Sequence, residues 1–118
     1  MTAQTNTGTR LNHIAVQVTD LAASTRFYQQ VVGLDTIPEP FHDGKHTWFA
    51  IGPGAALHLI QANSKPIVPG KNTHFCFSVA SVEEFVKTLN KYKVPFENWP
   101  GEAQAITTRT DGVKQIYF

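Results

Sequence analysis

An internal repeat is the feature of this 118-residue sequence that most constrains its fold. Residues 12–21 (NHIAVQVTDL) align with residues 73–82 (THFCFSVASV) at a constant offset of 61 positions. In both segments apolar residues recur at every second position: Ile14, Val16 and Val18 in the first, and Phe75, Phe77 and Val79 in the second. Such alternation is typical of a β-strand that buries one face. The repeat therefore predicts two copies of one structural unit.

A helix signal follows each alternating segment. Asp20 and Ser81 occupy equivalent positions, and both can accept hydrogen bonds from the free N–H groups of a helix N-terminus. The first helix is expected over residues 21–32, ended by Gly33, and the second over residues 82–93. Each copy thus begins as a strand followed by a capped helix.

Three further strands are expected after each helix. In chain order they are residues 35–41, 46–51 and 56–61, then 96–99, 105–110 and 113–118, with residues 42–45 expected to form a hairpin turn. This order predicts an α+β fold of two βαβββ modules, residues 11–62 and 73–118, within one domain. Residues 63–72, which contain two prolines, two lysines and a glycine, are the expected linker.

Composition excludes several classes of function. The formal net charge is +1 and Lys and Arg form no run, so we expect no nucleic-acid partner. No apolar stretch is long enough to span a bilayer, and the polar start of the chain does not look like a signal peptide. The single Cys76 cannot form an internal disulfide, which favours a cytoplasmic location.

The order of these motifs resembles the vicinal oxygen chelate superfamily, which includes glyoxalase I, bleomycin-resistance proteins, fosfomycin-resistance transferases and extradiol dioxygenases. The resemblance covers nearly the whole chain and implies a curved mixed sheet around a cavity. The motifs that carry it are Leu11-Asn12-His13-Ile14-Ala15-Val16, Asp20-Leu21, Phe27-Tyr28, Val31-Val32-Gly33-Leu34, Ala56-Leu57-His58-Leu59-Ile60, Thr73-His74-Phe75 and Asp111-Gly112-Val113-Lys114-Gln115-Ile116-Tyr117-Phe118.

The resemblance implies a divalent metal, Zn, Ni, Mn or Fe, held by His13, His58 and His74. Neutral imidazole suits such ions, and three protein ligands plus water leave an open position for chemistry. The alternative is that each histidine is a strand residue with its hydrogen bonds satisfied locally. The alignment of His13 with His74 favours ligands for that pair, whereas for His58 the two interpretations are balanced.

The sequence departs from the family pattern at its end. The family usually supplies a fourth ligand, a glutamate on the last strand after an Asp-Pro-Asp-Gly-like turn, and neither is present. The sequence stops inside the strand signal of residues 113–118, a pattern expected of a truncated chain. No catalytic residue is assigned.

Aromatic and basic residues supply the candidates for substrate binding. The aromatic residues can line an apolar pocket, and because Trp48 alternates with Phe49, we expect Trp48 to face the cavity and Phe49 the core. Tyr117 is a second candidate. Arg109 would clamp a carboxylate or phosphate if it points inward, and otherwise it is a surface residue. The remaining histidines, His42 and His46, flank a turn and are expected to be exposed.

Two functions from different classes follow. The first is a metal-dependent small-molecule enzyme: a lyase, isomerase or dioxygenase acting on a substrate with vicinal oxygens. The alternative is a metal-free protein that binds and sequesters a small molecule, as bleomycin-resistance proteins do. In either case we expect a small-molecule ligand and a homodimer, whose modules pair within one chain or are exchanged between two.

Overall fold

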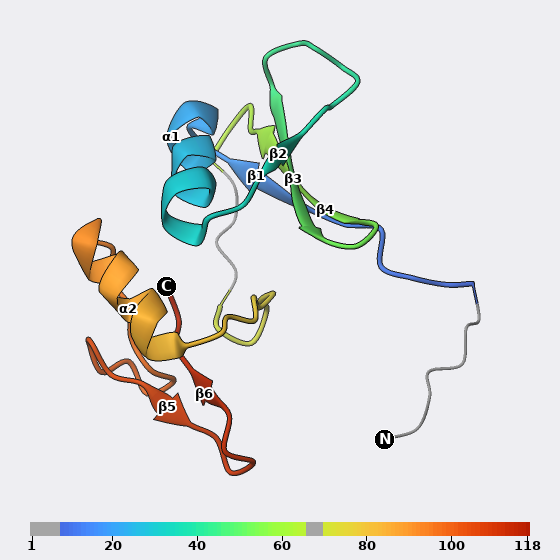
Figure 1. Ribbon diagram of the computed structural model, residues 1–118. Coiled ribbons are helices and arrows are strands. Elements are labelled where there is room, and N and C mark those ends of the chain that lie inside the picture. The colour runs from blue at the N-terminus through green and yellow to red at the C-terminus, as the bar shows by residue number, and fades with distance from the viewer. Residues whose placement is uncertain (1–7, 66–69) are drawn as a thin grey trace. The chain divides into compact units, whose positions relative to one another are not determined.

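The computed structural model describes residues 8–65 and 70–118 of the chain (Figure 1). The chain divides into two compact units, residues 1–66 and 67–118. Among the described residues, no helix has both the length and the apolar character needed to cross a bilayer.

The first unit is a four-stranded mixed sheet with one helical segment. Its strands lie in the order β1-β4-β3-β2, in which β1 runs parallel to β4 and the other neighbours are antiparallel. The elements are β1 (His13–Val18), α1 (Leu21–Arg26), η1 (Phe27–Val32), β2 (Thr36–Ile37), β3 (His46–Gly52) and β4 (Ala55–Gln61). This is the strand, helix, three-strand order expected from the sequence.

The core of the first unit lies where α1 packs on β3 and β4. Phe49, Leu57 and Leu59 have no exposed surface, and Phe49 pairs with Leu57 across the two strands. Since side chains alternate across a strand, the residues between them lie on the opposite face of the sheet. This opposite face, the open face of the sheet, is turned away from the core and carries Trp48 and His58.

The first helix begins as expected and ends differently. Asp20 accepts a hydrogen bond from the Ala23 N–H at 3.0 Å, and Gly33 ends the segment with a φ of 84°. Between them the α-helix gives way at Phe27 to the wider π-helical η1. Its last turn is closed by a hydrogen bond of 2.9 Å from the Leu34 N–H to the Tyr28 carbonyl.

The second unit contains α2 (Val82–Lys91) and the antiparallel pair β5 (Thr107–Thr108) and β6 (Lys114–Gln115). The Ser81 hydroxyl caps α2 by accepting from the Glu84 N–H at 3.1 Å. Leu89 is fully buried in this unit, and Glu97 forms isolated β-bridges to Ala103 and Tyr117.

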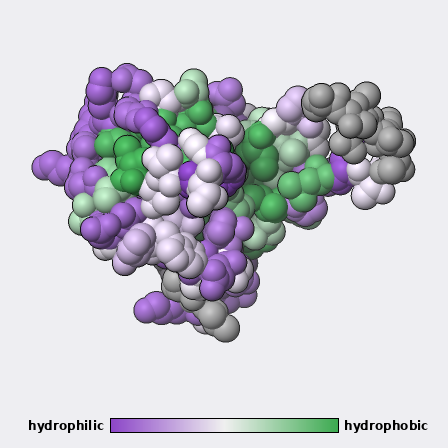
Figure 2. All heavy atoms as spheres, turned by 90° about the horizontal axis from the view of Figure 1, so that it is seen from below, coloured by the Kyte–Doolittle hydropathy of each residue, from purple (hydrophilic) through white to green (hydrophobic). Residues whose placement is uncertain are grey.

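Several expected strands are short or missing. Residues 73–79 form no strand, and β2, β5 and β6 each contain only two residues. A strand needs a ladder partner for its backbone, and the described residues supply none for 73–79. Phe75 and Val79 therefore remain 41% exposed, and other apolar residues also reach the surface, as the green regions of Figure 2 show. Residues 42–45 lie in a longer loop between β2 and β3 and do not form a tight hairpin turn.

Candidate functional site

A stack of three rings crosses the open face of the first unit's sheet. Trp48 lies directly opposite His58 in the β3–β4 register, and their rings are parallel within 3° at a centroid distance of 3.8 Å. On the other side, the His58 ring stacks on His13 of β1 at 4.2 Å and 14°. The strand register thus brings together two of the three expected metal ligands, together with the tryptophan expected to face the cavity.

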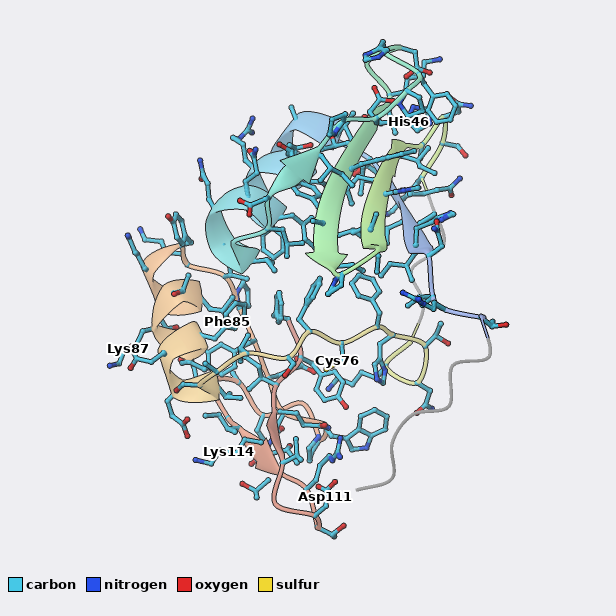
Figure 3. All side chains as sticks on the ribbon, turned by 45° about the vertical axis from the view of Figure 1, so that its right-hand side comes forward. His46, Cys76, Phe85, Lys87, Asp111 and Lys114 are labelled. Carbon is cyan, nitrogen blue, oxygen red and sulfur yellow. The ribbon has the colours of Figure 1, made fainter. Side chains whose placement is uncertain are left out.

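Two more rings extend this row toward the β2–β3 loop. Phe41 lies edge-on to Trp48 at 6.1 Å and packs against His46 at 4.6 Å. His46, labelled in Figure 3, pairs through Nδ1 with the Asp43 carboxylate at 2.9 Å, and only 19% of its side chain is exposed. The expectation of exposure is therefore wrong for His46, although it holds for His42. His46 lies two residues before Trp48 on one strand, and side chains at that spacing lie on the same face of a sheet. This spacing is the sequence signal that could have placed His46 on the open face.

A cavity of about 500 Å³ lies on this face. Its lining includes Asn12, His13, Ile37, Trp48, Ala56 and His58. The Trp48 indole nitrogen is buried and has no hydrogen-bond partner among the described residues. An unpaired buried donor costs about 1–3 kcal/mol, so a ligand or water oxygen that accepts from this N–H would be favoured.

Hydrogen bonds fix which imidazole nitrogen is free in two candidate ligands. The Nδ1 atom of His13 lies 2.7 Å from the Asn12 side-chain oxygen, and that of His74 lies 2.7 Å from the Lys71 carbonyl. Carbonyl oxygens only accept, so each Nδ1 carries the proton and each Nε2 keeps its lone pair. A second partner of this kind is the usual companion of a metal-ligating histidine.

His58 is held in its neutral form. Burial between its neighbours lowers the pKa of His58, and electrostatic interaction with the nearby imidazoles of His13 and His46 disfavours a positive charge on it further. Neutral imidazole is the form that binds metals. The environment of His58 is thus compatible with a ligand role.

The donors fit a divalent metal in type but not in their present orientation. Imidazole lone pairs lie in the ring plane, and a metal bonds at about 2.0–2.1 Å. Two parallel rings with centroids 4.2 Å apart cannot both direct lone pairs at one ion, so binding requires at least one ring to rotate. Accordingly, no three metal-binding side chains converge on one point in the part of the chain that the structure describes.

The remaining candidates lie in the second unit. The ring of His74 lies edge-on to Tyr117 at 6.0 Å, and Tyr117 packs against Trp99 at 5.7 Å. Arg109 precedes the β5–β6 turn, where its guanidinium donates to Asp111 at 3.1 Å and half of its side chain is exposed. The positive charge of Arg109 is therefore already paired with a carboxylate, as in a surface ion pair.

The Arg109–Asp111 pair gives a pH prediction. The hydrogen bonds and charge of Arg109 lower the pKa of Asp111 from 3.8 to about 2. Because folding favours the carboxylate, this pair stabilises the fold at neutral pH, and the contribution is lost as the pH falls through about 2. Replacing Arg109 with Gln should raise the Asp111 pKa toward its ordinary value. NMR titration of the side-chain carboxyl carbon measures this directly, and an unchanged midpoint would contradict the pairing.

Comparison with known proteins assigns the chain to a family. The profile of the glyoxalase/bleomycin resistance protein/dioxygenase superfamily matches residues 10–105. The chain belongs to this superfamily. The resemblance inferred from the sequence is thereby confirmed. No curated protein matches the sequence.

Solved structures of this superfamily share the α+β fold. The oxidase ChaP-H1 is 26% identical, with 92% of this chain and 85% of that chain covered and a TM-score of 0.72. The fosfomycin resistance protein FosX from Listeria monocytogenes is 22% identical, covering 93% and 83%, with a TM-score of 0.70. A lactoylglutathione lyase from Agrobacterium tumefaciens is 22% identical, covering 92% and 84%, with a TM-score of 0.65. Their similarity confirms the predicted fold class, a curved mixed sheet with few helices.

Proposed function

We propose that this superfamily member is a metal-dependent enzyme acting on a small molecule with vicinal oxygens. The observation that carries the proposal is the placement of His13 and His58 side by side on one cavity. The protonated Nδ1 of His13 and of His74 supports it, because each leaves Nε2 ready to bind a metal. In this proposal His74 completes the ligand set, from its own chain or from a second copy.

The residues of the cavity have distinct roles in this proposal. A bound divalent metal would polarise the substrate oxygens and stabilise the developing negative charge. Trp48 supplies a flat apolar surface, and its buried, unpaired N–H can donate to a substrate oxygen once a local movement exposes it. Asn12 holds the imidazole of His13 in the tautomer that ligation requires. Such chemistry fits a lyase, an isomerase or a dioxygenase.

The ring stack favours one alternative, a metal-free protein that binds a small aromatic or drug-like molecule. Trp48, His58 and His13 already form a nearly parallel series of flat surfaces without any metal. Aromatic surfaces of this kind bind planar ligands by offset stacking. In that case the histidines serve as packing surfaces and not as ligands.

Metal analysis of the purified chain separates the two functions. The enzyme proposal predicts near-stoichiometric Zn, Ni, Mn or Fe after reconstitution, together with activity that a chelator removes. Three assays sample the chemistry of the superfamily: lactoylglutathione formation, fosfomycin modification and dioxygenation of an aromatic diol. The alternative predicts that the chain takes up no metal and that planar aromatic compounds quench the fluorescence of Trp48 when they bind. That result would favour the binding protein.

We also propose a homodimer. The strand β1, which carries His13, is an edge strand of the described sheet, with one side of its backbone unpaired within that sheet. Exposed edges of this kind invite pairing with another chain, and such pairing would bring further residues next to His13. Sedimentation at micromolar concentration tests this, and a monomer there would contradict it.

A further inference from the structure

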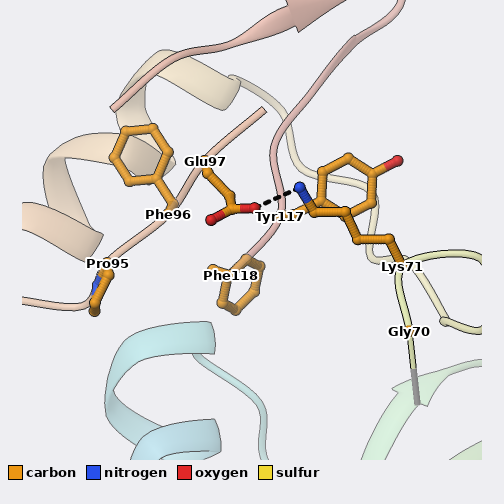
Figure 4. A pocket seen from close by; sticks show the side chains of 7 residues that line it. All are labelled: Gly70, Lys71, Pro95, Phe96, Glu97, Tyr117 and Phe118. Carbon is orange, nitrogen blue, oxygen red and sulfur yellow. Dashed lines mark ion pairs between the residues drawn. The ribbon is translucent and has the colours of Figure 1, made fainter. Parts of the chain in front are cut away.

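The ammonium group of Lys71 is enclosed by oxygen atoms of the second unit. Nζ donates to the carbonyls of Asn98 and Trp99, both at 2.9 Å, and forms an ion pair with the Glu97 carboxylate (Figure 4). A lysine ammonium has three protons, and here three oxygens lie around it. The hydrogen-bonding capacity of Lys71 is thus satisfied entirely by protein.

Two aromatic rings complete the enclosure. Nζ lies 5.2 Å from the centroid of the Tyr117 ring and 5.9 Å from that of Trp99. Both distances are within the range at which a cation is attracted to a ring face. For comparison, Lys87 pairs with one carboxylate on the outer side of α2 and keeps 74% of its side chain exposed, against 30% for Lys71.

Contacts that do not involve Lys71 hold this arrangement in place. The backbones of Glu97 and Tyr117 exchange hydrogen bonds of 2.9 and 2.8 Å. Asn98 is only 7% exposed, and its side chain makes two hydrogen bonds to Glu102, at 2.7 and 2.8 Å. The backbone that carries the two carbonyl oxygens is therefore preorganised, and preorganisation contributes to the affinity of a binding site.

We propose that Glu97, Asn98, Trp99 and Tyr117 form a recognition site for a primary alkylammonium ion, and that Lys71 is its built-in occupant. The site lies beside a cavity of about 350 Å³ that Lys71, Glu97 and Tyr117 help to line. The stem of Lys71 fills the approach to the oxygens, so an external amine can enter only when that stem is removed.

Occupation of the site also makes Lys71 a positioning residue for His74. The bound side chain of Lys71 fixes the backbone of the same residue. The Lys71 backbone carbonyl accepts a hydrogen bond from the His74 Nδ1–H at 2.7 Å. Tyr117 contacts the His74 ring from the side. The ammonium site stands on its own contacts, whereas the value of a fixed His74 to chemistry rests on the proposed function.

Chemical rescue tests the ammonium site. Lys71→Ala removes Cγ, Cδ, Cε and Nζ, and propylammonium supplies the same number of carbon and nitrogen atoms. The variant should have a Tm lower by on the order of 5 °C. Propylammonium should restore at least half of this loss, whereas sodium chloride at equal ionic strength should not. The matched variant Lys87→Ala should show neither the loss nor the rescue. Equal shifts with both salts, or a Tm unchanged in Lys71→Ala, would overturn the site.

The tautomer of His74 tests the positioning role without any metal. In the unmodified chain, ¹⁵N NMR should show the His74 proton on Nδ1. Lys71→Met keeps an apolar stem and removes the charge, so the chain stays folded while a population with the proton on Nε2 appears. Lys71→Arg keeps a cation and should restore part of the original signal. A tautomer that is the same in Lys71→Met and the unmodified chain would overturn the positioning role and leave the rescue result standing.

Discussion

Replacing Phe49 with alanine should lower the free energy of unfolding of the first unit by about 3–5 kcal/mol. Phe49 has no exposed surface, pairs with Leu57 across β3 and β4, and packs against the ring of Tyr28 at 6.0 Å. Truncation removes apolar contact on all of these sides and leaves a cavity that close-packed neighbours fill only in part. Urea unfolding, followed through the amide signals of residues 46–61, measures the loss.

Phe41 provides the matched control for this change. It is the same residue type in the same unit, but 58% of it is exposed. Replacing Phe41 with alanine should lower the free energy of unfolding by less than about 1 kcal/mol, because an exposed side chain makes few contacts that truncation could remove. Equal costs at the two positions would mean that the buried face of the sheet does not carry the stability of the unit.

The buried and open faces of the first unit could be predicted from sequence because alternation determines them. Once Ile14 and Leu57 are assigned to the core, His13 and His58 must lie on the other face. Alternation does not give the register between strands, however. The stacking of His58 between Trp48 and His13 depends on which residues of β1, β3 and β4 lie opposite one another, and that becomes known only when the strands pair.

The strand prediction from alternation was wrong for a segment that has no partner strand among the described residues. Residues 73–79 repeat the pattern of β1, yet the described residues give them no ladder, so they form no strand. The transition from α1 to η1 was also missed, because a π-helical turn has no periodicity of its own in sequence. At Lys71 the sequence predicts only a linker, since nothing in its neighbourhood in the sequence shows that Glu97 and Tyr117 meet there.

Replacing His13 with alanine should abolish stable metal binding in this protein. In the proposed site His13 is one of three imidazole ligands, and its loss leaves two without a carboxylate, which is a weak donor set for any of the expected ions. Loss of an outer partner such as Asn12 typically costs 10–100-fold in metal affinity, so loss of the ligand itself should cost at least ~100-fold. Elemental analysis after dialysis against a weak chelator measures the difference.

Two further variants make the result specific to the open face of the sheet. Asn12→Ala should weaken metal binding without abolishing it, because the His13 ring remains but its tautomer is no longer fixed. His42→Ala should leave metal content unchanged, since His42 is an exposed residue of the β2–β3 loop. If His13→Ala kept its metal while His42→Ala lost it, the ligands would lie outside the cavity. If all three variants kept their metal, His13 would not be a ligand and would serve only as a packing surface for His58.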